Sequence, residues 1–239
     1  MIRKFLFLIT AFFIFYNFHY AQQDNISSEI NSEVKELYNF HEIIYPIWHT
    51  AYPEKDYKAL RSFLPEVNKL AGDLYSAKLP GILRDKQEKW DNGITEFKNA
   101  VAEYNESAKG SDDEELLKAA ENLHAKYEMM ARIIRPVLKE VEEFHKVLYI
   151  VYHKDLADKN FDAIKTASKQ FITKADAITK AKLSRRLENK TYKFKLAASD
   201  LLNAAQELEK VCNEGSNQEI NVAVNKLHSK YQVLEKIFD

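Results

Sequence analysis

The stretch that decides the fold is residues 113–135, DEELLKAAENLHAKYEMMARIIR, in which apolar side chains recur every three or four positions. That spacing places them on one face of an α-helix. The pattern returns 104 positions later at residues 217–239, NQEINVAVNKLHSKYQVLEKIFD. Both stretches contain a Leu-His-x-Lys-Tyr motif, at 123–127 and 227–231. They predict two copies of one amphipathic helix.

The repeat extends over most of the chain. Residues 33–135 and 137–239 align without a gap and share 25 identities over 103 pairs. Every histidine outside the first 21 residues has a matched partner, and the three pairs are His41 with His145, His49 with His153, and His124 with His228. At one-quarter identity, three unrelated positions would all be kept by chance in roughly 1–2% of cases. The matched histidines therefore indicate a shared role.

The fold class predicted is all-α, a tandem duplication of an up-down-up-down four-helix bundle. Five glycines and five prolines in 239 residues leave little turn material for a sheet protein. The helical period returns four times in each copy, and short connections make neighbouring helices antiparallel. The expected helices are 33–52, 56–78, 82–108 and 113–135 in the first copy and 137–156, 160–181, 185–212 and 217–238 in the second.

Helix breaks are expected at Pro53, at residues 80–81, at 109–112 and at 213–216. Ser111, with Glu114 three residues later, predicts a capping box at the start of the fourth helix. Pro136 is the only helix-breaking residue between the two copies. A proline there either begins a helix or kinks one, so we expect a stiff joint.

Residues 1–21 resemble a secretory signal peptide, followed by an N-terminal segment at 22–32. Arg3 and Lys4 precede an apolar run at residues 5–16, which is shorter than the ~20 residues of a membrane span. Ala21 offers a small residue at the cleavage site, although His19 is untypical there. We expect a periplasmic or secreted protein, the alternative being an uncleaved anchor.

The cysteine count and the charge balance indicate what holds the fold together and which partners to expect. Cys212 is the single cysteine and faces Ala108 in the alignment, so disulfides cannot hold the fold and a small buried residue is expected. The first copy carries 15 Lys and Arg against 19 Asp and Glu, and the second 18 against 15. Net charges of −4 and +3 favour packing of the copies on each other. The near-neutral total argues against nucleic acid as a partner.

The histidine positions predict a metal site in each copy. On a helical wheel, His41 and His124 both lie about 100° from the centre of their apolar faces. Antiparallel alignment puts His41 level with residue 127 and His124 level with residue 44, an offset of ~4.5 Å. We therefore expect His41 with His124, and His145 with His228, to share Cu(II), Zn(II) or Ni(II), with Cu(II) or Zn(II) favoured. Such an open two-histidine site suits a carrier or sensor.

His49 and His153 lie near 180° on the wheel, away from the core and ~12 Å along the helix from His41 and His145. With nearby tyrosines they form a possible second site or an interface, between the copies or with another protein. The tyrosines concerned are Tyr45, Tyr149, Tyr127 and Tyr231. An anionic ligand is not repeated: Glu121 and Glu128 flank His124, whereas Asn225 and Gln232 flank His228. That difference argues against the carboxylate chemistry of di-iron bundles.

In topology and repeat length, each copy resembles the small exported b-type and c-prime cytochromes. In the b-type members, a ligand from the first helix and a histidine of the last hold a haem, and His41 and His124 occupy comparable helices. The resemblance therefore implies haem b and electron transfer as a third hypothesis. The chain has no Cys-x-x-Cys-His motif, and the wheels place both imidazoles on the flank of the bundle.

Two alternatives to metal binding remain. Boundary histidines commonly form hydrogen bonds in a structural role, which would leave a non-catalytic protein-binding or scaffold bundle. Catalysis is not expected, because no nucleophile elbow, phosphate loop or zinc-protease motif is present.

Overall fold

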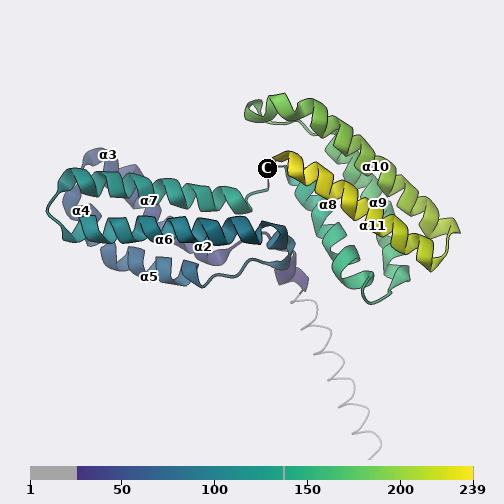
Figure 1. The fold of residues 1–239 in the computed structure, drawn as a ribbon, viewed down its shortest axis with the longest axis horizontal. Coiled ribbons are helices and arrows are strands. Elements are labelled where there is room, and N and C mark those ends of the chain that lie inside the picture. Colours follow the sequence, from purple (N-terminus) through teal and green to yellow (C-terminus); the bar gives the residue numbers. More distant parts are fainter. Residues whose placement is uncertain (1–25, 137, 239) are drawn as a thin grey trace, which may run out of the picture. The chain divides into compact units, whose positions relative to one another are not determined.

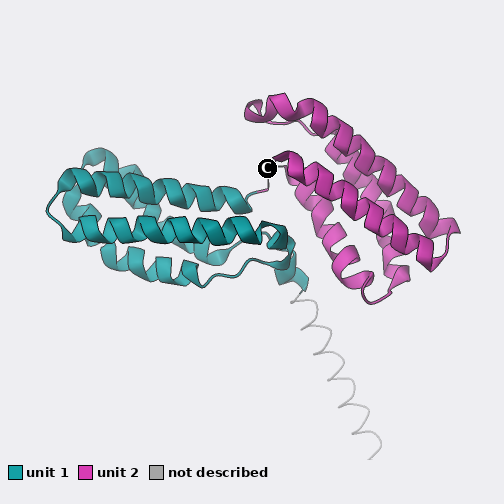
Figure 2. Ribbon diagram, viewed as in Figure 1, with its two compact units in different colours: residues 1–135 teal, residues 136–239 magenta. Residues whose placement is uncertain are grey.

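The computed structural model describes residues 26–136 and 138–238, and these residues form helices and connections with no strand. The predicted all-α class is confirmed. The chain divides into two compact units, residues 1–135 and 136–239, each described here by itself (Figure 2). The leader predicted at 1–21 lies outside the described residues. None of the described helices is both long and apolar enough to cross a bilayer.

After a short helical stretch at residues 26–29, unit 1 contains an uninterrupted helical segment with one π-helical turn. Figure 1 shows the arrangement of the labelled helices. This segment comprises α2 (Lys35–Pro46), the π-helix η1 (Ile47–Ala51) and α3 (Tyr52–Glu54). The remaining elements are α4 (Tyr57–Ser62), α5 (Leu64–Tyr75), the 3-10 helix η2 (Gly81–Lys86), α6 (Gln87–Lys109) and α7 (Asp113–Ile134).

Unit 2 follows the same order of elements, with one long helix in place of α4 and α5. It comprises α8 (Lys139–Ile150), the π-helix η3 (Val151–Asp155), α9 (Phe161–Lys180), the 3-10 helix η4 (Arg185–Lys190), α10 (Thr191–Glu214), α11 (Asn217–Glu235) and the 3-10 helix η5 (Lys236–Phe238).

Each unit buries a continuous apolar core between its helices. In unit 1, α5 packs on α2 and α6, and α6 packs on α7; in unit 2, α9 packs on α8 and α10, and α10 packs on α11. Phe40 and Leu123 are completely buried in the first core, as are Phe144 and Leu227 in the second. These are the apolar faces that the helical period predicts. Cys212 is also buried, as expected for a small apolar residue.

Two predicted helix boundaries need correction. Pro53 does not break the first helix, because it lies within α3, which follows η1 without interruption. The helix ends instead at Lys55, which adopts the left-handed conformation with φ of 53°. The N-cap of α7 is Asp112 rather than Ser111, and its carboxylate accepts from the N–H groups of Glu114 and Glu115.

The turn after the first helical segment is built alike in both units. Lys159, the match of Lys55, is also left-handed, with φ of 55°. The next residue caps the following helix in each case: Asp56 accepts from the N–H of Ala59, and Asn160 accepts from the N–H of Ala163. The two copies therefore share local backbone geometry at a position where lysine is not the preferred residue.

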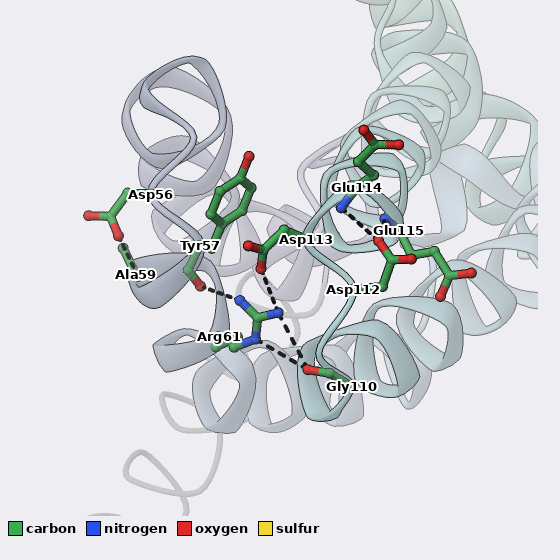
Figure 3. A network of polar contacts seen from close by, with 9 residues as sticks. All are labelled: Asp56, Tyr57, Ala59, Arg61, Gly110, Asp112, Asp113, Glu114 and Glu115. Carbon is green, nitrogen blue, oxygen red and sulfur yellow. Dashed lines mark hydrogen bonds and ion pairs between the residues drawn. The ribbon is translucent and has the colours of Figure 1, made fainter.

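Arg61 ties α4 to the connection between α6 and α7 (Figure 3). Its guanidinium donates to the carbonyl of Gly110 at 3.4 Å and pairs with Asp113 at 2.8 Å. A third donor reaches the carbonyl of Tyr57, one turn earlier on α4. These contacts hold the N-terminus of α7, the helix that carries His124, against the first half of the unit.

Candidate metal site

A π-helical turn lies in the first helical segment of each unit, at matched positions. In η1 the N–H of Tyr52 donates to the carbonyl of Ile47, and in η3 the N–H of Leu156 donates to the carbonyl of Val151. An i→i+5 turn advances by a smaller angle per residue than an α-helical turn, and such turns are frequent at functional sites. A wheel drawn with the α-helical period therefore misplaces the residues in and beyond each turn.

Two histidines and a tyrosine, spaced four residues apart, follow one another along the first helical segment of each unit. His41, Tyr45 and His49 form a row along the helix, with ring centroids 5.7 Å and 4.5 Å apart in succession. In unit 2, His145, Tyr149 and His153 form the matching row, at 6.4 Å and 4.8 Å. The sequence groups His49 and His153 with Tyr45 and Tyr149, and these contacts agree with that grouping. His49 is exposed, as its predicted place away from the core requires, whereas His153 is half-buried.

A flat ring stack joins the π-turn to the last helix in each unit. The indole of Trp48 stacks on the imidazole of His124, with centroids 4.0 Å apart and planes 4° apart. Tyr152 stacks on His228 in the same way, at 3.7 Å and 6°. Trp48 and Tyr152 hold matched positions, so an aromatic ring at this place is common to both copies. The histidine and tyrosine pattern of the sequence does not single out Trp48 or Tyr152 as part of a site.

The same stack sets the neighbours of the last-helix histidine. The rings of His153 and His228 lie with centroids 6.2 Å apart and nearly perpendicular planes. In unit 1, the charge of His49 is one of the causes that lower the pKa of His124, and the ring of His49 contacts that of Tyr45. The structure therefore brings His153 beside His228, although the helical wheels assigned them to different sites.

His41 and His145 lie against tyrosines of the last helix. The ring of His41 is 6.0 Å from that of Tyr127, and the ring of His145 stacks at 4.5 Å on that of Tyr231. The predicted level of His41 with residue 127 is thus supported. The predicted level of His124 with residue 44 is one turn too low, because His124 contacts Trp48. The π-turn accounts for part of this shift, because a π-helical turn contains more residues than an α-helical turn.

Burial and nearby charges shift the pKa values of His124 and Tyr127. Burial lowers the pKa of His124 because it disfavours the charged imidazolium, and the nearby positive groups His49 and Arg132 act in the same direction. Glu128 opposes this shift by attracting the proton. Burial also raises the pKa of Tyr127 to about 12, so its hydroxyl stays protonated. His124 is therefore neutral near pH 7, the state in which an imidazole can bind a metal ion.

In unit 1, a carboxylate is held beside the stack. Trp48 also stacks on Tyr52 at 4.6 Å, and the hydroxyl of Tyr52 donates to Glu121 at 3.3 Å. Burial and the charge of Glu121 both raise the pKa of Tyr52. In unit 2 the matched residues are Leu156 and Asn225, so the hydroxyl donor and the carboxylate acceptor are both replaced.

The candidate site of each unit offers few side chains that could bind a metal ion. Among residues 26–136 and 138–238, no group of three or more His, Cys, Asp or Glu side chains is arranged to hold a metal ion. Two imidazoles that share a metal ion through nitrogens at about 2 Å have ring centroids roughly 5–6 Å apart, close to the separation of His153 and His228. The arrangement fits an open site in which water or an external ligand completes the coordination sphere.

No protein-family model, no curated protein and no solved structure matches this chain significantly, so the assignment of its chemistry rests on the geometry alone.

Proposed function

We propose that the protein is an exported carrier or sensor of transition-metal ions. In this proposal the chain is a tandem duplication of an up-down-up-down four-helix bundle, and each bundle binds one Cu(II) or Zn(II) ion. The site lies between the π-turn and the last helix. Its ligands are His49 with His124 in unit 1 and His153 with His228 in unit 2.

The observation that carries this proposal is the pairing of His153 with His228. Their rings come from two different helices, lie 6.2 Å apart, and have matched counterparts in unit 1. The stacks on Trp48 and Tyr152 fix the plane of one imidazole in each pair, which reduces the entropy lost when a metal ion binds. His41 and His145, the first-helix ligands predicted from sequence, are not ligands in this proposal; they lie next to Tyr127 and Tyr231 of the last helices.

Metal titration by calorimetry tests the proposal. We expect about two equivalents of Cu(II) or Zn(II) per chain, and weaker binding as the pH falls through ~6.5, because protonated imidazole cannot bind a metal ion. His124→Ala should remove one equivalent, and His124→Ala with His228→Ala should remove both. Unchanged binding in the double variant would exclude these sites.

A non-catalytic protein-binding bundle is the second candidate. It is favoured by two large apolar side chains one turn apart on α10, Tyr192 and Leu196, which are 80% and 57% exposed. The matched residues in unit 1 are Glu88 and Asn92, so this apolar pair belongs to unit 2 alone. Haem b is the third candidate and the least supported, since Phe40, Leu123 and Tyr127 fill the interior next to these histidines. An absorption spectrum after haem addition tests it.

A further inference from the structure

We propose that the end of unit 2 at which α10 begins is a docking site for the surface of anionic phospholipid bilayers. In this proposal Tyr192 and Leu196 enter the headgroup region, and the lysines and arginines around them bind lipid phosphates. The binding is peripheral, in keeping with described helices that are too short or too polar to cross a bilayer. It is independent of metal binding, because it uses none of the residues of the candidate metal site.

The connection between α9 and α10 carries a concentration of positive charge. Residues 182–195 contain six Lys and Arg and one Glu, whereas the matched residues 78–91 of unit 1 contain four Lys and Arg and three Asp and Glu. The local net charge is therefore +5 in unit 2 and +1 in unit 1. This difference makes the end of unit 2 attractive to anions.

Five of these basic side chains are exposed, and none of the five forms an ion pair within residues 138–238. They are Lys182, Arg185, Arg186, Lys193 and Lys195. The sixth, Lys190, donates to the carbonyl of Ile237 at 2.6 Å and so ties η4 to η5. The five exposed groups therefore keep their charge available to an external anion.

Tyr192 and Leu196 form an apolar ridge in the first turns of α10. They lie one turn apart and are 80% and 57% exposed. At about 100° per residue, the ridge points away from Phe194, whose side chain is buried in the core. Lys193 and Lys195 lie about 80° to either side of the ridge. Interfacial helices use this arrangement to place apolar groups in a bilayer while the ammonium groups reach the phosphates.

The apolar surface extends from α10 onto α11, which packs beside it (Figure 1). Lys230 of α11 pairs with Asp200 of α10 at 2.7 Å, so these two residues lie at the same level. Leu196 lies one turn before Asp200, and Val233 lies one turn after Lys230 on the antiparallel neighbour. Val233 is 55% exposed and is therefore level with Leu196 at the same end of the unit.

The composition of this surface favours a bilayer over an acidic protein or a nucleic acid. Lysine is depleted in protein interfaces, yet three of the five exposed basic residues are lysines. A single-strand groove stacks successive bases on aromatic rings, whereas this ridge pairs one tyrosine with a leucine. A headgroup layer accepts both kinds of group, because tyrosine and leucine enter it and lysine stays hydrated beside the phosphates. The charge around Tyr192 and Leu196 thus assigns to a bilayer the pair that also favours a protein-binding bundle.

The expected strength follows from the number of these groups. Each basic residue close to a strongly anionic bilayer strengthens binding by about fivefold. Partial burial of an apolar side chain adds about three- to tenfold. Because salt screens the attraction, binding should weaken steeply as ionic strength rises.

Vesicle co-sedimentation tests the proposal with residues 22–239. This chain keeps both compact units and omits only the predicted leader, whose apolar run would bind lipid by itself. The vesicles consist of phosphatidylcholine alone or mixed with phosphatidylserine, and we expect binding to the mixed vesicles. Lys193→Gln with Lys195→Gln should weaken this binding by more than about tenfold. Tyr192→Ser with Leu196→Ser should weaken it by about tenfold.

Matched controls remove the same kinds of group elsewhere in unit 2. Lys165→Gln with Lys169→Gln removes two exposed lysines of α9 that lie three or more turns from Lys180. Val222→Ser removes an apolar side chain of α11 that is 63% exposed and three turns from Val233. Both controls should weaken vesicle binding far less than the variants at the end of the unit. Circular dichroism of every variant checks that the helices are kept.

The outcomes decide between the possible occupants. Equal losses in the lysine control and in Lys193→Gln with Lys195→Gln would overturn the proposal, because net charge alone would then drive binding. Full binding in Tyr192→Ser with Leu196→Ser would overturn the entry of the ridge into the bilayer. The absence of binding to mixed vesicles would reject a bilayer, and polyglutamate binding that is lost in Lys193→Gln with Lys195→Gln would then identify an acidic protein as the partner.

Discussion

The imidazole of His124 lies flat against the indole of Trp48, with ring centroids 4.0 Å apart and planes 4° apart. This stack joins the π-turn of the first helical segment to the last helix of unit 1. Because Tyr152 and His228 repeat it in unit 2, the stack defines the candidate site in both copies.

Replacing Trp48 by alanine should destabilise unit 1 and expose the imidazole of His124 to water. We expect Trp48→Ala to lower the free energy of unfolding by about 1–3 kcal/mol, from lost packing and lost stacking. The pKa of His124 should rise toward its ordinary value, since burial is the main cause that lowers it. Histidine titration by NMR and denaturant unfolding measure both effects. Trp48→Tyr, which copies unit 2, is the control that should keep the stack.

The stability of unit 1 should fall in mild acid. The pKa of His124 is lower in the folded chain than the value of 6.5 for a free histidine, so the unfolded state binds the proton more tightly. The stabilisation is complete above pH 6.5 and is lost as the pH falls through the lowered folded pKa. Tryptophan-detected urea unfolding between pH 8 and 5 measures this for unit 1. A His124→Gln variant with the same acid dependence would contradict the prediction.

His41 and His49 should differ in their effect on metal binding. The ring of His41 lies 6.0 Å from that of Tyr127, whereas His49 is the proposed partner of His124, so His49→Ala should weaken the binding of Zn(II) to unit 1 and His41→Ala should not. Calorimetry in a background carrying His228→Ala isolates this unit. If only His41→Ala weakens binding, the pairing expected from the helical wheels is right and the π-turn pairing is wrong.

The N-cap of α7 should belong to Asp112. Its carboxylate accepts from two backbone N–H groups of the first turn, so Asp112→Ala should cost about 1 kcal/mol of stability. Ser111→Ala should change stability by less than about 0.5 kcal/mol, as is usual for an exposed residue without such contacts. Thermal unfolding of the two variants compares them directly. In unit 2 the cap is a full capping box, in which Ser216 and Glu219 bond reciprocally.

The expected packing of the two units on each other, drawn from their opposite net charges, stays a prediction. Small-angle scattering of the full chain at low and high salt would measure it. If the charges −4 and +3 drive the contact, the radius should grow as salt is added. A radius that does not depend on salt would remove this electrostatic argument.

The amino-acid sequence by itself determined the helical fold, the apolar face of each helix and the matched histidines. These features are local or periodic: Leu123 and Tyr127 are buried because the 3.6-residue period places them together on one face. The internal match likewise identified the tyrosines of the stripe without any structure. Helix ends were predicted less well, since Asp112 and Ser111 are both able to cap a helix and only backbone geometry selects one.

Only the tertiary structure decided which histidines meet. Pro46 directly precedes the π-turn at Ile47–Ala51, but Ile150 precedes the one at Val151–Asp155, so no proline or glycine marks both turns. Each turn rotates the following residues off the α-helical wheel. Contact with the last helix then placed Trp48 on His124 and Tyr152 on His228. The physical reason is that a side chain's neighbours across a bundle depend on accumulated helix rotation and register, which one irregular turn is enough to change.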